Sequence, residues 1–202
     1  MTIEKGAAWG ETVGRPDDLE IAVDDADLAR RLHAGGRSVG VASGDVFTTL
    51  GARPVGDRTE VQRLPIDLLE VSLDGSEPVP AVAHVLFRRP WYRGGWFAGD
   101  VIAVMNAEFV RGLDLAPRGH PNDGRAEVVT VSGRSSLRER LAIRRRARTG
   151  THLPHPAIAT QSVRSRSWVF DRPHVVIVDG RRRGSATDVG IVVHADAAHL
   201  HA

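Results

Sequence analysis

An acidic loop follows an Ala-Pro step in the stretch LDLAPRGHPNDGRAEVV, residues 113–129. Asn122-Asp123-Gly124 closes the loop, and an alternating apolar pattern typical of a strand comes after it. Mg²⁺ and Ca²⁺ prefer oxygen ligands, which the Asp123 carboxylate and neighbouring carbonyls can supply. Asn-Asp-Gly is equally suited to a tight turn that holds no ion. Asp123 is therefore a candidate metal ligand, with a plain turn as the alternative.

A second candidate combines aromatic rings with arginine. The segment FRRPWYRGGWF, residues 87–97, holds five of the ten aromatic side chains of the chain. Rings such as those of Trp91 and Trp96 suit the boundary between water and an apolar phase, and a guanidinium such as that of Arg93 suits a phosphate. The segment predicts a site for lipid or a membrane interface. The alternative is an aromatic cap at the end of a sheet core.

A third candidate is a basic helix over residues 135–149, SSLRERLAIRRRART, with a serine cap and Glu139 in its first turns. Such a helix can lie on anionic lipid. The alternative is a solvated helix that buries only a narrow seam of Leu137 and Leu141. The seven arginines of residues 134–148 are Arg134, Arg138, Arg140, Arg144, Arg145, Arg146 and Arg148. Of these, Arg144 and Arg145 are candidate anion ligands.

Several other chemistries find no support. The chain has no cysteine, which excludes disulfides, thiolate metal sites and cysteine nucleophiles. His152 and His155 are not spaced as two ligands on one helix face, so we do not expect zinc. Neither Gly-x-Ser-x-Gly nor His-Glu-x-x-His occurs, so hydrolase chemistry is not indicated.

Charge is carried almost entirely by arginine, since Lys5 is the single lysine. The formal net charge is +2, and the isoelectric point is about 9.8. Arginine suits phosphate recognition, but a GC-rich genome explains the same bias. No nucleic-acid-binding motif is present, so we expect no nucleic-acid partner.

Length and hydropathy predict one large domain, or one domain with a small appendage, because 42% of the 202 residues are hydrophobic. The N-terminal MTIEKGAAWGE has no apolar signal region, and no run reaches the roughly 18 apolar residues of a spanning helix. We therefore expect a cytoplasmic bacterial protein, with peripheral membrane association left open. A homodimer is also left open.

The hydrophobic pattern predicts a small β-α-β unit over residues 18–45, followed by a helical turn. After Pro54, repeated strand patterns with glycine turns predict an antiparallel β-sandwich, interrupted by the basic helix. The expected division is a reduced α/β segment, residues 1–52, and a β domain, residues 53–202. The predicted strands of the β domain are residues 66–73, 80–87, 100–109, 126–132, 161–170, 174–180 and 188–195.

Four segments of the β domain, in the same order and spacing, and one earlier segment resemble bacterial lipid kinases of the diacylglycerol kinase-like and sphingosine kinase-like family. VIAVMNAEFVRGLDLAP, LAPRGHPNDGRAEVV, RTGTHLPHPAIATQSVRSRSWVF and HVVIVDGRRRG resemble motifs of the family's C-terminal β domain, over roughly residues 60–195. VGVASGDVFTTLG resembles the family's Gly-Asn-Asp-Phe-Ala segment, with Asp45 on its aspartate. The resemblance implies a β-sandwich fold and ATP- and Mg²⁺-dependent lipid phosphorylation. It makes Asp45 and Asp179 candidate catalytic residues, and Gly44 and Asp45 candidate cofactor ligands.

Three departures weigh against that activity. The family's Gly-Gly-Asp-Gly-Thr motif, which binds ATP phosphates and supplies a catalytic aspartate, does not occur in this sequence, and about fifty residues before position 52 are too few for the usual ATP-binding domain. Arg181 stands where the family has a glutamate, and an arginine can neither orient Mg²⁺ nor accept a proton. Asn122 replaces a family carboxylate.

The sequence therefore predicts a non-catalytic or degenerate lipid-kinase-like protein that binds a lipid or a phosphorylated small molecule, with an anionic membrane surface as a further partner. Mg²⁺ remains a candidate cofactor, whereas the departures argue against ATP. Two alternatives remain: an active ATP- and Mg²⁺-dependent lipid phosphotransferase, and an assembly module that completes a separately encoded kinase domain.

Overall fold

The computed structural model describes residues 9–52 and 54–202. Lys5 and the rest of the N-terminal segment before Trp9 lie outside the described residues, as does position 53 at the expected domain boundary. Within the described chain, no helix is both long enough and apolar enough to cross a membrane.

The described chain begins with a small β-α-β unit, one strand before it and one short helix after it. Asp24 caps α1, because its side chain accepts the backbone N–H of Asp27 at 2.8 Å, and Leu28 and Leu32 are buried on one face of the helix. The strands β2 and β3 pair in parallel across this helix. The elements are β1 (Glu11–Gly14), β2 (Glu20–Ala22), α1 (Asp25–His33), β3 (Val39–Val41) and α2 (Asp45–Thr49).

Strands dominate the rest of the chain, with α3 (Leu137–Arg146) as the main interruption. Two short 3₁₀ turns, η1 (Trp91–Arg93) and η2 (Ala147–Thr149), accompany them. The strands are β4 (Glu60–Leu73), β5 (Val79–Ala81), β6 (His84–Arg88), β7 (Val101–Met105), β8 (Phe109–Val110), β9 (Leu113–Asp114), β10 (Ala126–Val131), β11 (Ile158–Val163), β12 (Ser165–Val178) and β13 (Arg181–His201).

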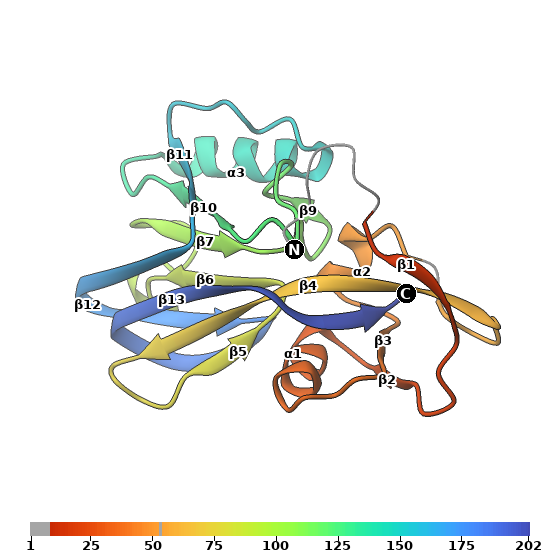
Figure 1. The fold of residues 1–202 in the computed structure, drawn as a ribbon. Coiled ribbons are helices and arrows are strands. Elements are labelled where there is room, and N and C mark those ends of the chain that lie inside the picture. The colour runs from red at the N-terminus through yellow and green to blue at the C-terminus, as the bar shows by residue number, and fades with distance from the viewer. Residues whose placement is uncertain (1–8, 53) are drawn as a thin grey trace.

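Eleven strands of the described residues form one hydrogen-bonded sheet, whose main path is β1-β4-β13-β12-β6-β7-β10-β11. Every pairing along this path is antiparallel. The register is irregular between Val169 and His174 in β12 and between His194 and Ala198 in β13, and such irregularities let a sheet bend. The sheet accordingly turns back on itself, and β7 and β10 lie above β12, β13 and β4 (Figure 1).

Both faces of β7 and β10 are apolar, because each face is covered. Side chains alternate along a strand. Ile102 and Val128 point into the core between the two layers, where Phe87 also lies. Ala103 and Val129 point to the opposite face, toward α3 and the β8–β9 hairpin. The sandwich core and the space under α3 are therefore two sides of the same strands.

The predicted mainly antiparallel β fold is confirmed, with two differences in detail. The two layers belong to one continuous sheet and are not separate sheets. The strand predicted at 161–170 is divided between the end of β11 and the start of β12, and β12 runs on through Pro173 into the strand predicted at 174–180. Pro173 is accommodated because it lies in the irregular register between Val169 and His174, where the ladder needs no donor from it.

The predicted leucine seam of α3 is wrong. Leu137 and Leu141 are 54% and 48% exposed, whereas Arg140 and Ile143 are buried. A buried arginine is tolerated when carbonyl oxygens satisfy it. The Arg140 guanidinium donates to several carbonyls beside the helix, so the polar residue, not the leucines, anchors α3. The start of the helix was predicted to within two residues: α3 begins at Leu137, and Ser136 and Glu139 form its capping box.

The aromatic segment between β6 and β7 does not cap the sheet core. Phe87 is fully buried in the core, but the exposed fractions of Trp91, Tyr92 and Phe97 are 80%, 68% and 55%. The core-cap interpretation is therefore wrong for these three rings.

The contrast between these aromatic positions yields a stability prediction. Phe87→Ala should lower the free energy of unfolding by about 3–5 kcal/mol, because it empties a core site that contacts Trp168 and Phe170. Urea denaturation measures the loss, and Trp91→Ala is the matched control, expected to change stability by less than about 0.5 kcal/mol. Equal losses in both variants would contradict the assignment of the core.

Candidate binding cavity and the aspartate cluster beside it

Asp45, a candidate catalytic and cofactor residue, begins helix α2. The Asp25 carboxylate caps this helix, accepting the backbone N–H groups of Asp45 at 2.7 Å and Val46 at 3.1 Å. Gly44 has φ +116°, and a Cβ at this position would collide with the Asp25 carboxylate. Gly44 is thus required by the close approach of Asp25, and its predicted role as a cofactor ligand stays a prediction.

The Asp45 side chain is engaged by protein groups on both oxygens. One oxygen accepts the backbone N–H of Arg111 at 2.6 Å, and the other lies 3.4 Å from Nδ1 of His84. Burial raises the pKa of Asp45. The hydrogen bond from Arg111 joins α2 to the turn between β8 and β9.

Asp179, the second candidate catalytic residue, occupies the turn between β12 and β13 with φ +46°. Its carboxylate accepts the backbone N–H groups of Val82, Ala83 and His84, each at 2.9 Å. Burial raises the pKa of Asp179 to about 6, although these three hydrogen bonds lower it. The structure thus brings Asp45 and Asp179 together at His84, with both carboxylates holding backbone groups.

His84 separates the aspartate cluster from a cavity. The residue is 1% exposed, and burial lowers the pKa of His84 to about 4. The imidazole is therefore neutral at pH 7, and its contact with Asp45 is a polar contact, not an ion pair. Nδ1 has no hydrogen-bond partner within the described chain. His84 also lines the cavity.

A cavity of about 700 Å³ lies between the sheet, the β8–β9 hairpin and α3. Leu86, Ala103, Val129, Ile143 and Ile177 form apolar walls from four strands and the helix. Six lining residues are arginines, and no described Asp or Glu is among the lining residues. These arginines are Arg88, Arg111, Arg140, Arg144, Arg148 and Arg182.

Arg88 and Arg182 are the most unusual of these arginines. Burial and the charge of Arg182 lower the pKa of Arg88. The Arg88 Nε is buried without a hydrogen-bond partner, and neither guanidinium has an ion-pair partner in the described part of the chain. Two like charges without a carboxylate, at the wall of an apolar cavity, are an arrangement that an oxyanion would stabilise.

The remaining predicted lipid and anion ligands divide into two groups. Trp96 and Arg144 line the cavity. Trp91, Arg93 and Arg145 do not line it but lie exposed, the first two in η1 and the third on α3.

Asp123 lies in a loop whose anchor is Asp67, a residue that the sequence analysis missed. The buried Asp67 carboxylate accepts the backbone N–H groups of Gly124 at 2.6 Å and Asp196 at 2.8 Å. Asp123 accepts the N–H of Arg125 at 2.9 Å, and burial raises the pKa of Asp123 to about 6. The one available signal for Asp67 was a polar residue inside an apolar strand. Asp123 stays a predicted metal ligand.

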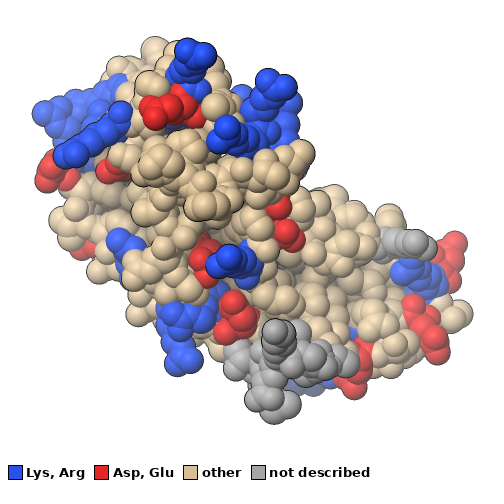
Figure 2. All heavy atoms as spheres, turned by 90° about the horizontal axis from the view of Figure 1, so that it is seen from above, with Lys and Arg blue, Asp and Glu red and all other residues tan. Residues whose placement is uncertain are grey.

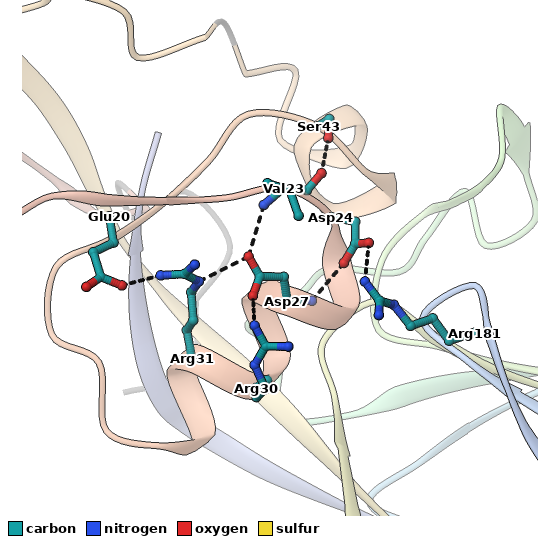
Figure 3. Close-up of polar contacts among 8 residues, drawn as sticks. All are labelled: Glu20, Val23, Asp24, Asp27, Arg30, Arg31, Ser43 and Arg181. Atoms are coloured by element: carbon teal, nitrogen blue, oxygen red, sulfur yellow. Dashed lines mark hydrogen bonds and ion pairs between the residues drawn. The ribbon is translucent and has the colours of Figure 1, made fainter.

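Arg181, at the position where the resemblance implies a glutamate, has a partner in the N-terminal unit. Its guanidinium lies 2.7 Å from the Asp24 carboxylate at the start of α1 (Figure 3). Although partial burial pushes the pKa of Asp24 upward, the hydrogen bond and charge of Arg181 hold it below its usual value. This exposed pair adds little stability, but it commits Arg181 to a structural contact.

The same close-up shows how α1 is held. Asp27 accepts hydrogen bonds from Arg30 and Arg31, and Arg31 also contacts Glu20 (Figure 3). The hydroxyl of Ser43 donates to the carbonyl of Val23 at 2.7 Å. These polar contacts join α1, β2 and the segment that leads into α2.

Comparison with known proteins bears on the fold. The crystal structure of a putative diacylglycerol kinase from Bacillus anthracis str. Sterne matches with a TM-score of 0.64 and 12% sequence identity, over 91% of this chain and 77% of that one. A second structure with the same description and source matches with a TM-score of 0.62 and 12% identity, over 88% of this chain and 75% of that one.

This chain shares its fold with these proteins. The predicted resemblance is thus confirmed at the level of structure. Family models and curated protein sequences give no match.

The Asp25 cap predicts a pH dependence of stability. Burial, with the neighbouring Asp179 and Asp45 carboxylates, raises the pKa of Asp25 from 3.8 to about 7, although two N–H groups lower it. Between about pH 4 and 7 the folded protein therefore keeps a proton that the unfolded chain releases. The contribution of Asp25 to the free energy of unfolding is largest at the acidic end and falls as the pH rises.

Asp25→Asn should make the slope of stability against pH less negative, by up to about 1.4 kcal/mol per pH unit in that window. Urea denaturation at several pH values measures the slope. Asp17→Asn changes an exposed aspartate and should leave the slope as in the wild type. An unchanged slope in Asp25→Asn would show that Asp25 does not hold this proton.

Proposed function

We propose that this protein binds an amphipathic lipid with an anionic head group in the cavity under α3, and that it does not transfer phosphate. The observation that carries the proposal is the lining of the cavity, which combines apolar walls with arginines and, among the described residues, no carboxylate.

The apolar walls suit a hydrocarbon chain. Ala103, Val129 and Ile177 come from three strands of the sheet, and Ile143 on α3 lines the same cavity. Burial of hydrocarbon contributes about 0.8 kcal/mol per CH₂ group. A buried chain of several carbons would therefore contribute a large part of the binding free energy, in addition to the contacts of the head group.

The head group would lie against Arg88 and Arg182. An anion there would relieve the repulsion between the two guanidiniums and give the buried Arg88 Nε an acceptor. Phosphate and carboxylate both match the guanidinium fork. The proposal therefore includes both phospholipids and fatty acids. The first have a phosphate head group and the second a carboxylate, but both have a hydrocarbon chain.

The absence of phosphate transfer rests on the structural contacts of the candidate catalytic groups. Asp179 holds three backbone N–H groups, Asp45 holds Arg111 and His84, and Arg181 is paired with Asp24. In the described chain, no group of three or more His, Cys, Asp or Glu residues could hold a metal ion. These residues therefore do not fit Mg²⁺ with ATP.

One contact favours the rival function, an ATP- and Mg²⁺-dependent lipid phosphotransferase. His84 lines the cavity and its Nδ1 lies 3.4 Å from the Asp45 carboxylate behind it, and such a pair is able to take a proton from a hydroxyl group. Asp45 would then be the residue on which activity depends.

Calorimetric titration tests the binding proposal with oleate, with a lysophosphatidic acid and with glycerol phosphate, which lacks the chain. The two lipids should bind and glycerol phosphate should not. Arg182→Gln should weaken lipid binding by about ten- to a hundredfold, since it removes a charge-assisted hydrogen bond. Arg183→Gln, an adjacent exposed arginine outside the cavity lining, is the matched control.

The outcomes of this titration are distinct. Binding of only one lipid identifies the anion, whereas binding of glycerol phosphate alone would favour a phosphorylated small molecule and overturn the lipid proposal. Equal losses in Arg182→Gln and Arg183→Gln would overturn the assignment of the head-group site.

A radiolabel assay tests phosphate transfer. With ATP, Mg²⁺ and diacylglycerol or a sphingoid base, the protein should transfer no phosphate above background. Turnover that disappears in Asp45→Ala but persists in Asp57→Ala, an exposed aspartate, would establish the rival enzyme. Turnover that needs an added, separate α/β kinase domain would favour the assembly module.

A further inference from the structure

Two segments that contribute to the cavity lining also carry exposed apolar side chains, which we call the rim surface. It consists of Trp91, Tyr92, Trp96 and Phe97 from the segment between β6 and β7, and Leu137 and Leu141 from α3. Each of these side chains is at least 40% exposed. A group of exposed apolar side chains on a protein surface marks an interaction site more often than chance.

The two parts of the rim surface are fixed to each other by Arg140. Its guanidinium donates to the carbonyl of Trp96 at 3.0 Å, to that of Ser132 at 2.9 Å, and to that of Gly99. Arg140 is 6% exposed, so this contact lies beneath the surface. Arg140 therefore holds α3 next to the aromatic segment, and both segments contribute residues to the cavity lining.

Cavity and rim share residues. Trp96, Phe97 and Leu141 are exposed and also line the cavity. The guanidinium of Arg88, part of the proposed head-group site, lies 5.0 Å from the centre of the Trp96 ring. A ligand at Arg88 is consequently beside the rim surface.

Arginines surround the rim surface. α3 carries exposed Arg138, Arg144 and Arg145, and its one acidic residue, Glu139, is committed to the capping box with Ser136. Seen from above, many basic side chains gather around the part of the molecule that contains α3, with uncharged surface and a smaller number of acidic side chains between them (Figure 2). The rim surface is thus apolar at its centre and positive at its margin.

We infer that the rim surface docks on an anionic lipid bilayer. Tryptophan, tyrosine and leucine side chains enter the interface between head groups and acyl chains, while the surrounding guanidiniums bind lipid phosphates. Charge complementarity selects this partner, because apolar groups at the centre of a basic margin match the layers of an anionic membrane. Docking places the cavity mouth against the source of an amphipathic ligand, so this inference extends the proposed function.

Vesicle sedimentation tests the docking. The wild-type protein should sediment with vesicles of phosphatidylcholine and phosphatidylglycerol, bind vesicles of phosphatidylcholine alone at least tenfold more weakly, and dissociate as salt is raised. Fluorescence of Trp91 and Trp96 should shift to the blue on binding, and Trp91→Phe/Trp96→Phe should lose most of that shift.

Two matched double variants distinguish the effect of the rim arginines on vesicle binding from the effect of the net charge of the protein. Arg138→Glu/Arg145→Glu should weaken binding to anionic vesicles by at least about twentyfold, since each basic residue contributes about fivefold. Neither residue lines the cavity. Arg37→Glu/Arg58→Glu makes the same change of charge after α1 and before β4, away from α3 (Figure 1), and should weaken binding by less than threefold.

The experiments distinguish a failure of the docking inference from a failure of the proposed lipid binding in the cavity. Titration with short-chain, monomeric lipid should give Arg138→Glu/Arg145→Glu the wild-type affinity, so loss of vesicle binding alone is attributable to the rim. Vesicle binding that ignores lipid charge and salt, or equal losses in both reversal pairs, would reject the rim as the docking surface. Loss of lipid binding in the cavity with intact vesicle binding would reject the proposed function and leave the docking in place.

Discussion

The buried carboxylate of Asp179 is the interaction on which the arrangement of the cavity most depends. It lies in the turn between β12 and β13 and receives three backbone N–H groups from residues 82–84, at the start of β6. A buried carboxylate is costly unless it is hydrogen-bonded, so this turn and this segment are held in one geometry. That geometry sets His84 between the aspartate cluster and the cavity.

Other carboxylates of the protein work in the same way. Asp25 caps α2, Asp67 holds the loop at 122–124, and Asp45 holds the turn of the β8–β9 hairpin. Each joins segments that are far apart in the sequence by accepting backbone N–H groups. Asp45 and Asp179, the two catalytic candidates, thus hold backbone groups in the same way as Asp25 and Asp67, and burial raises the pKa of all four.

Arginine side chains complement these carboxylates, because their length and their five N–H donors let them reach and bind acceptor groups. The buried Arg140 donates to carbonyls of a neighbouring loop, whereas Arg88 and Arg182, at the cavity wall, have no carboxylate partner among the described residues. The same residue type therefore serves as an internal anchor in one place and forms the proposed head-group site in another. The difference is whether carbonyl oxygens surround the guanidinium.

The sequence by itself determined the strands, the β-α-β unit and the cap of α3, because alternation, glycine turns and the serine–glutamate pair are local signals. It also indicated the family resemblance through ordered motifs. Only the tertiary structure decided which face of α3 is buried. The periodicity pointed to Leu137 and Leu141, but the carbonyls that make Arg140 the better buried residue come from residues 96–99 and 132, and no local pattern identifies them. The cavity likewise depends on strands and a helix that meet only after the sheet has bent back on itself.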